Sequence, residues 1–314
     1  MSSTRAVPPL DFVVVGAQRC ATTHLNACLR SHPEIFMCRD EVPYFEHPFF
    51  ERSAPTALAA ALGGATAAQR RGIQRPDYLA RPECAGNIQS VAPDARILAV
   101  LRDPVARAVS AYHWYLQFGL LPLVPLDDGI ERLLDGWTDS AHPRAHEIID
   151  LGFYGRHLQR YLDAFGAHRV LVLLGDDLQE PATFPRLFRF LGVDEHHHPR
   201  TADRPTNAGT YDLRRLRVLR ARRRLAWSWD GVSEYTYRPR RLRRPVASLV
   251  SAAVVGFDRV VLARALGAGP PIALRPDLEQ RLRKVYEEDV ERLEALLRRD
   301  LRRWRDGAPL SPTS

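Results

Sequence analysis

The most informative part of the sequence is GAQRCATTHL, from Gly16 to Leu25. It follows the apolar run FVVV at 12–15 and leads into a helical pattern of apolar residues at Leu25, Cys28 and Leu29. A buried strand, a short loop and a helix form an anion site, because unpaired N–H groups and the positive end of the helix dipole point at the loop. The sequence therefore predicts a phosphate-binding loop here.

The loop lacks the usual lysine of a nucleotide-hydrolysing P-loop, whose pattern is GxxxxGK[ST]. Ala21, Thr22 and Thr23 stand where that pattern has Gly, Lys and Ser/Thr, and Arg19 supplies a cation three residues earlier. Such a loop suits a phosphate that needs no magnesium bridge. The alternative is an ordinary strand-to-helix turn.

A second motif, ILAVLRDPVARAVSAYHWY, spans residues 97–115. Asp103 is a suitable N-cap and Pro104 a suitable first helical residue, so Arg102 is expected at the carboxyl end of a strand. Ligands of open α/β sheets bind at that edge. Arg102 and Ser110 could hold a second phosphate through charge-assisted hydrogen bonds, or Arg102 could pair with Asp103 or another neighbour.

Three apolar runs, at 12–15, 97–101 and 170–174, are separated by helical patterns, which is typical of buried parallel strands with helical crossovers. We predict an α/β fold: a single P-loop-type domain over residues 1–314, with a central parallel sheet flanked by helices on both faces and a helical C-terminal part. Residues 210–275 are expected to vary, and residues 277–305 to form a closing helix.

The net charge of +8 comes from one segment: residues 214–244 hold twelve arginines against two acidic residues, so the rest of the chain sums to about −2. That segment could face phosphates, an acidic substrate or an anionic membrane, or be solvated. The four cysteines form no CxxC pair, which favours free thiols. The first residues lack the apolar stretch of a secretory signal, so we expect a cytoplasmic protein.

Residues 246–256 are apolar but too few for a membrane span, which needs about 20 residues. With the flanking arginines, they predict either peripheral membrane contact through 240–266 or a helix docked on the domain. No group of His, Cys, Asp and Glu has metal-ligand spacing, so we expect no metal. The sequence makes no prediction of oligomeric state.

In this order, the two motifs resemble those of sulfotransferases that use 3'-phosphoadenosine-5'-phosphosulfate (PAPS), both bacterial members and the heparan sulfate type. Their motifs read GxxKxGTT and RDPxxRxxSxY; here they read GAQRCATT and RDPVARAVSAY, with departures at Arg19 and Ala21. Residues 151–178, 188–193 and 286–304 also resemble the middle and the closing helix of that family.

The resemblance implies a donor site and an acceptor class. The loop would hold the 5' end of PAPS through Arg19, Cys20, Ala21, Thr22 and Thr23, and Arg102 and Ser110 would hold the 3'-phosphate. Arg19 would stabilise charge on the leaving phosphate during catalysis. The product would be 3',5'-adenosine bisphosphate, and the acceptor a hydroxyl or amine of a glycan, lipid or natural product.

The resemblance also implies a base. RDEVPYFE, at 39–46, is similar to the KExxFF stretch of the heparan sulfate type, so Glu41 is the candidate general base; the alternative is a surface carboxylate. The acid and the Ser or Thr that precede Pro-x-Tyr in the family are replaced here, with Arg75 at the hydroxyl position. We assign Arg75, Tyr78 and His113 to the acceptor side, although a helix histidine is often structural.

Two other functions compete with this one. A magnesium-dependent kinase or hydrolase is disfavoured by Thr22 at the lysine position and by the lack of an obvious magnesium-binding carboxylate after an apolar strand. A nucleic-acid or membrane-surface protein could use residues 214–244, where aromatic residues interleave with arginines. Such a module needs neither anion loop, so no nucleic-acid partner is expected.

Overall fold

The computed structural model describes residues 10–52, 56–199 and 273–307, together with residues 213, 216, 217 and 220 and two short strands at 227–229 and 237–239. Most of the segment 210–275 and the proposed membrane contact through 240–266 therefore lie outside the described residues. In the part of the chain that is described, no helix is both long and apolar enough to cross a membrane.

The chain divides into two compact units. The first comprises residues 1–104, 153–206 and 287–303 and contains the large sheet; the second comprises 105–152, 207–286 and 304–314. The expectation of a single domain over 1–314 stays a prediction.

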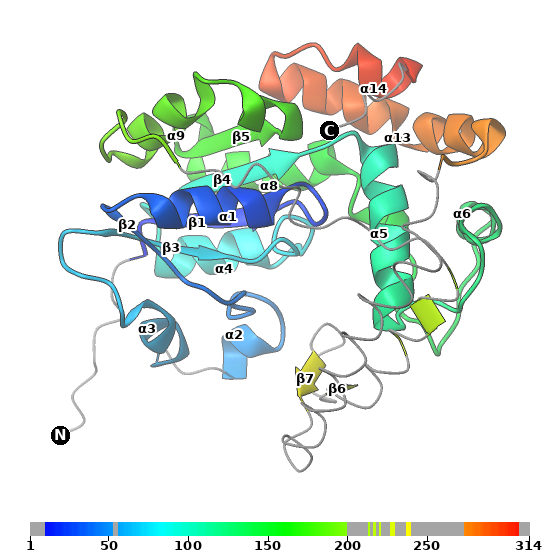
Figure 1. The fold of residues 1–314 in the computed structure, drawn as a ribbon, viewed down its shortest axis with the longest axis horizontal. Helices are drawn as coiled ribbons and strands as arrows, with labels where there is room; N and C mark the ends of the chain where they lie inside the picture. Colours follow the sequence, from blue (N-terminus) through cyan, green and yellow to red (C-terminus); the bar gives the residue numbers. More distant parts are fainter. Residues whose placement is uncertain are drawn as a thin grey trace, which may run out of the picture. The chain divides into compact units, whose positions relative to one another are not determined.

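The sheet of the first unit has five parallel strands in the order β2-β3-β1-β4-β5 (Figure 1). The strands are β1 (Phe12–Gly16), β2 (Ile35–Met37), β3 (Arg70–Gln74), β4 (Arg96–Leu101) and β5 (Val170–Leu174). The predicted α/β class and the three predicted strands are confirmed. Strands β2, which has three residues, and β3, which begins with two arginines, were not predicted from the sequence.

Both faces of this sheet are covered. Phe12 and Val14 face a core that includes Leu25 of α1 and Phe188 of α9, and Val13 and Val15, which alternate with them, are equally buried. The helices of this unit are α1 (Thr22–Ser31), α2 (Phe49–Arg52), α3 (Thr56–Leu62), α4 (Cys84–Val91), α8 (Tyr154–Phe165) and α9 (Thr183–Leu191), with 3-10 turns η1 (Ala167–Arg169) and η2 (Gly175–Gln179).

The second unit consists mainly of helices: α5 (Pro104–Phe118), whose first residue ends the 1–104 segment of the first unit, α6 (Leu126–Leu134), α7 (Glu147–Asp150) and the part of α14 (Arg302–Asp306) from residue 304 onward. Strands β6 (Trp227–Trp229) and β7 (Tyr237–Pro239) form an antiparallel pair. A buried ion pair joins Arg144 Nη2 to Glu147 Oε2 at 2.7 Å, and Tyr115 donates a hydrogen bond to the same carboxylate.

The predicted closing helix is correct only for its first part. Helix α13 spans Pro276–Leu297 and contributes to both units, and the helical run then breaks before α14. Arg298 has a φ of 50°, in the left-handed region that ends a right-handed helix. The continuous helix over 277–305 is therefore two helices.

Backbone geometry shapes the loop between β1 and α1. Arg19 and Ala21 have φ values of 67° and 61°, which glycine adopts readily and other residues at a cost. Ala21 is the N-cap of α1 and has no side-chain oxygen to cap the helix. The first N–H groups of α1 are therefore left for a ligand in the loop.

Replacing Ala21 with glycine should relieve this left-handed position. We expect Ala21→Gly to raise the free energy of unfolding by about 0.5–1 kcal/mol, because relief of the left-handed strain exceeds the entropy that glycine loses on folding. Urea unfolding measures the change. Ala60→Gly, at an exposed position inside α3, is the matched control and should lose about 1 kcal/mol. A similar loss of unfolding free energy in both variants would show that the backbone of Ala21 is not strained.

An ion pair joins the end of β5 to the segment after α13. Arg299 donates to both carboxylate oxygens of buried Asp177, at 2.5 and 2.6 Å, and the Leu174 amide donates to Oδ2 at 2.8 Å. Burial alone would raise the pKa of Asp177, but these hydrogen bonds hold it below its usual value. The ionised carboxylate therefore stabilises the fold.

Arg299→Gln should lower the free energy of unfolding by about 1–3 kcal/mol near pH 7, because a buried carboxylate loses its charged donors. A depressed carboxyl pKa contributes stability that is complete above the unfolded-state pKa and is lost as the pH falls through the folded-state pKa. The difference between wild type and variant should therefore shrink below about pH 4. Arg302→Gln removes an exposed pair with Asp300 and should change stability by less than about 0.5 kcal/mol. Equal losses in the two variants would count against the buried pair.

Candidate active site

Four of the segments that the sequence analysis singled out follow neighbouring parallel strands of the first unit. The loop at 17–21 follows β1, Arg102 follows β4, Arg75 follows β3, and Glu41 lies four residues after β2. Because the strands are parallel, their carboxyl ends share one edge of the sheet, the edge at which ligands bind in open α/β folds. The structure therefore brings these predicted residues to one edge.

Residues 17–21, which the resemblance predicts to hold the donor and which are called the donor loop below, are attached directly to β4. The Ala17 amide donates to the Val100 carbonyl at 2.8 Å, and Gly16 pairs with Ala99. Cys20 is buried, with its Sγ 3.4 Å from the Tyr154 hydroxyl, so its side chain faces the interior. Cys20 can therefore offer a ligand its backbone but not its thiol.

The polar side chains of the loop and of the first turn of α1 differ in burial. Thr22 is buried and Thr23 is exposed, and both lie in the first turn of α1. Arg19 is partly buried in its left-handed conformation. Gln18, which the sequence analysis did not single out, is buried and donates through Nε2 to Asp77 Oδ1 at 3.0 Å. That bond ties the donor loop to the segment after β3.

Arg102 is half-buried at the end of β4. Across the residues that the structure describes, its guanidinium makes no hydrogen bond, ion pair or ring contact, so the pairing with Asp103 or another neighbour is not formed. A cation held beside an anion-binding loop without a protein partner is available to a negatively charged ligand.

Ser110 and His113 lie on α5, in the second unit. Ser110 is partly exposed, and His113 is buried with its Nδ1–H donating to the Val109 carbonyl at 2.9 Å. This bond fits the structural alternative for His113. The binding roles of both residues stay predictions.

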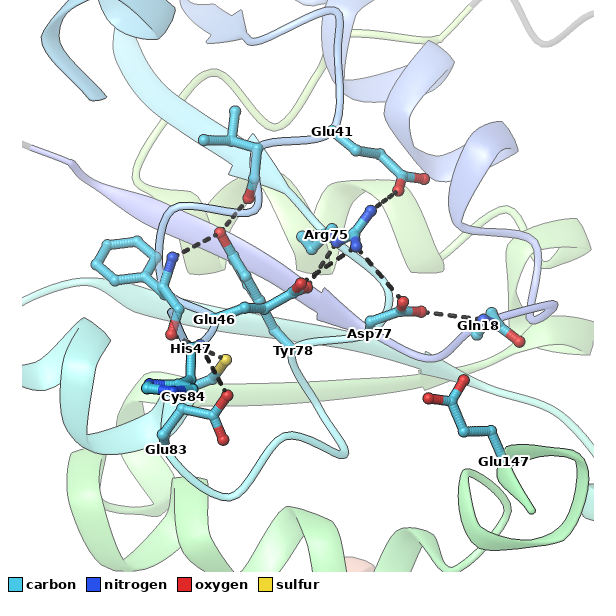
Figure 2. A network of polar contacts seen from close by, with 12 residues as sticks. Gln18, Glu41, Glu46, His47, Arg75, Asp77, Tyr78, Glu83, Cys84 and Glu147 are labelled. Carbon is cyan, nitrogen blue, oxygen red and sulfur yellow. Dashed lines mark hydrogen bonds and ion pairs between the residues drawn. The ribbon is translucent and has the colours of Figure 1, made fainter. Parts of the chain in front are cut away.

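Glu41 belongs to a network of charges centred on Arg75 (Figure 2). Arg75 Nη1 donates to Glu41 Oε2 at 3.0 Å, while Nε and Nη2 donate to the two carboxylate oxygens of Glu46 at 2.6 and 3.2 Å. Asp77 Oδ2 lies 3.6 Å from Nη2. Arg75 thus faces three carboxylates, and its proposed contact with an acceptor stays a prediction.

The side chain of Glu41 is 49% exposed, so it can reach both Arg75 and a bound molecule. Desolvation raises its pKa; Arg75 offsets part of that rise, and the negative charges of Asp77 and Glu46 add to it. A raised carboxyl pKa suits a general base, because proton transfer is efficient when the pKa approaches the working pH.

Glu46 is a residue that the sequence analysis missed. Its side chain is fully buried, and burial raises its pKa while the two hydrogen bonds from Arg75 lower it. The sequence signal was an acid inside the aromatic stretch YFEHPFF, at 44–50, where an unpaired charge would be costly. Its partner, Arg75, however, follows β3 and cannot be read from that stretch.

Tyr78 is fully buried beneath the same segment. Its hydroxyl donates to the Val42 carbonyl and accepts a hydrogen bond from the Phe45 amide at 3.3 Å. These bonds hold the backbone between Glu41 and Glu46, as Figure 2 shows. Contact between Tyr78 and an acceptor stays a prediction.

Gln74, the last residue of β3, was also missed. It is buried, and within the described chain its Oε1 has no hydrogen-bond partner. Buried polar atoms are rarely left unpaired, so a bound ligand or water is the expected partner. Among the described residues, no group of three or more His, Cys, Asp or Glu could hold a metal ion, and the expected absence of a metal stays a prediction.

The sequence is similar to those of known sulfotransferases. Residues 9–202, more than half of the chain, match the family model of the sulfotransferase domain. The human heparan sulfate glucosamine 3-O-sulfotransferase 3B1 is 27% identical over 203 residues, which are 61% of this chain and 48% of that protein. The membrane-associated sulfotransferase kil1 of Dictyostelium discoideum is 28% identical over 169 residues, 49% of this chain and 31% of that protein.

A solved structure shares the fold. The sulfotransferase from Alicyclobacillus acidocaldarius superposes with a TM-score of 0.61 at 22% identity, covering 95% of this chain and 98% of that one. The curated relatives named above are matched over less than half of their own length. The two motifs, their placement on neighbouring strand ends and the family match together show that this chain belongs to the sulfotransferase family.

Proposed function

We propose that this protein transfers a sulfuryl group from PAPS to a hydroxyl or amine of an acceptor. The observation that carries the proposal is Arg102: a half-buried cation at the end of β4, beside the donor loop, with no partner among the described residues. The donor has phosphate groups at both ends of its ribose. An anion-binding loop and a cation on adjacent strands suit such a molecule.

Each described residue has a defined task in this proposal. The N–H groups of Thr22 and Thr23 and the side chain of Arg19 bind the 5' end of the donor, and Arg102 binds the 3'-phosphate together with Ser110. As the sulfuryl group leaves its phosphate oxygen, negative charge grows on that oxygen and Arg19 stabilises it. Arginine stays protonated, so it acts as a clamp and not as an acid.

Glu41 is the proposed base. It accepts the proton of the acceptor hydroxyl or amine while that oxygen or nitrogen forms its bond to sulfur. Its half-exposed carboxylate and its raised pKa support this role. Because the human relative 3B1 is named for heparan sulfate, a glycan hydroxyl is the first acceptor to test, followed by lipids and natural products.

Calorimetry with 3',5'-adenosine bisphosphate and with magnesium ATP tests the donor. Micromolar binding of the bisphosphate together with weak binding of ATP is expected, because Thr22 replaces the lysine that reaches the terminal phosphates in a P-loop. Preference for magnesium ATP would instead indicate a kinase or hydrolase.

Arg102→Ala should weaken binding of the bisphosphate about tenfold to a hundredfold, the loss of a charge-assisted hydrogen bond worth about 1.5–3 kcal/mol. Calorimetry measures it. The control is Arg169→Ala. Arg169 directly precedes β5, at the opposite edge of the sheet, and pairs with Asp94, so its removal should leave binding of the bisphosphate unchanged. Equal affinity in Arg102→Ala and wild type would remove Arg102 from the donor site.

Glu41→Gln should lower turnover about 10²- to 10⁴-fold while binding of the bisphosphate is unchanged, because the amide cannot accept the proton. In wild type the rate should fall as the pH drops through the pKa of Glu41, since the base must be ionised. Asp40→Asn, at the exposed neighbouring acid, is the control and should keep most of the turnover. Full turnover in Glu41→Gln would exclude Glu41 as the base.

A further inference from the structure

The three carboxylates around Arg75 differ in their contacts with its guanidinium and in their burial. Glu46 takes two N–H groups of the guanidinium in a fork and is fully buried, whereas Glu41 takes one and is half-exposed. A forked pair sets the plane and direction of the guanidinium, while a single contact does not. The orientation of Arg75 is therefore set by Glu46, and Arg75 in turn defines where the carboxylate of Glu41 rests.

The same guanidinium connects to the donor loop. Asp77 lies 3.6 Å from Arg75 Nη2 on one side and accepts a hydrogen bond from Gln18 at 3.0 Å on the other. Gln18 directly precedes Arg19. Figure 2 shows the continuous path from Glu41 through Arg75 and Asp77 to Gln18.

We propose that Arg75 is a positioning residue for the reaction: held by Glu46, it fixes the place and charge of Glu41 and ties that carboxylate, through Asp77 and Gln18, to the donor loop. This inference rests on the proposed function in that Glu41 is the base. In this proposal Arg75 positions Glu41 and does not contact the acceptor directly. Glu46 orients Arg75, and Gln18 connects the network to the donor loop.

The charged groups around Glu41 affect its pKa in opposite directions, which provides a test of the proposal. Arg75 lowers the pKa of Glu41, whereas Glu46 and Asp77 raise it, and these are the charged groups that face Glu41 from β3 and from its own segment. Arg39 and Asp40, next to it in the chain, are exposed and oppose each other in charge. Removing Arg75 and removing Glu46 should therefore move the pKa of Glu41 in opposite directions.

Carbon-13 NMR titration of the glutamate carboxyl groups measures this pKa in the protein alone, with the Glu41 signal assigned from Glu41→Gln. We expect Arg75→Gln to raise the pKa of Glu41 and Glu46→Gln to lower it. Arg169→Gln removes a distant arginine and should leave the pKa in place. An unchanged pKa in Arg75→Gln, or a rise in Glu46→Gln, would overturn the proposal.

Turnover separates positioning from acceptor contact. If Arg75 positions the base, Arg75→Gln moves the acid limb of kcat/KM to higher pH and lowers kcat, and Arg75→Lys restores part of both. If Arg75 binds the acceptor instead, the acceptor KM rises while the acid limb stays where it is. The second pattern would contradict the proposal.

A folding defect is separated by a paired variant. Arg75→Gln leaves Glu46 buried without its cation, so this variant should lose thermal stability. The double variant Arg75→Gln/Glu46→Gln replaces the pair with neutral hydrogen-bonding groups and should regain much of that stability. Its Glu41 pKa should lie between those of the single variants; a value outside that interval would contradict the assigned charges.

The connection from Arg75 through Asp77 to the donor loop is tested by binding of 3',5'-adenosine bisphosphate. Asp77→Asn should both lower the pKa of Glu41 and weaken binding of 3',5'-adenosine bisphosphate several-fold, whereas Glu46→Gln should affect the pKa alone. Full bisphosphate affinity in Asp77→Asn would remove the donor loop from the proposal. Failure of wild-type protein to bind the bisphosphate would refute the donor but leave the NMR titrations, which use neither donor nor acceptor, to decide the role of Arg75.

Discussion

Parallel pairing of β1 with β4 is the constraint on which the site depends. It places the donor loop next to the residue that follows β4, and the 2.8 Å bond from the Ala17 amide to the Val100 carbonyl joins the two segments. Arg102 is thereby held beside an uncapped helix N-terminus. The donor loop and Arg102 could bind the two separate phosphate groups of one ligand. This explains their proximity more simply than a structural role in the fold does.

On the other side of β1, the fold buries charge. Glu46 and Asp77 lie beneath the surface beside Arg75, and such groups contribute little to stability once their desolvation is included. Breaking one partner of such a set is costly, so its members depend on one another. Their position, between the exposed carboxylate of Glu41 and the donor loop, gives this buried charge a use in orienting groups for reaction.

The structural elements that could be predicted from the sequence are those with a clear local pattern of residues. FVVV and ILAVL are apolar along their whole length because β1 and β4 are buried on both faces. VLVLL is equally apolar, although the first three residues of the edge strand β5 are only partly buried. RDP marks a strand end and a helix start. Strand β3 was missed because it begins with Arg70 and Arg71. Its Gly72 leaves room for the ring of Phe12, a tertiary contact that the sequence does not display. The Arg75–Glu46 pair was missed for the same reason, since its members come from different strand ends.

We expect this edge of the sheet to recognise the 3'-phosphate as well as the 5' end of an adenine nucleotide. Calorimetry with 3',5'-adenosine bisphosphate and with adenosine 5'-monophosphate, which lacks only that phosphate, tests it most directly. We expect the bisphosphate to bind at least about tenfold more tightly, the value of one charge-assisted contact. Equal affinities would mean that this edge has no site for the 3'-phosphate and that Arg102 serves another purpose.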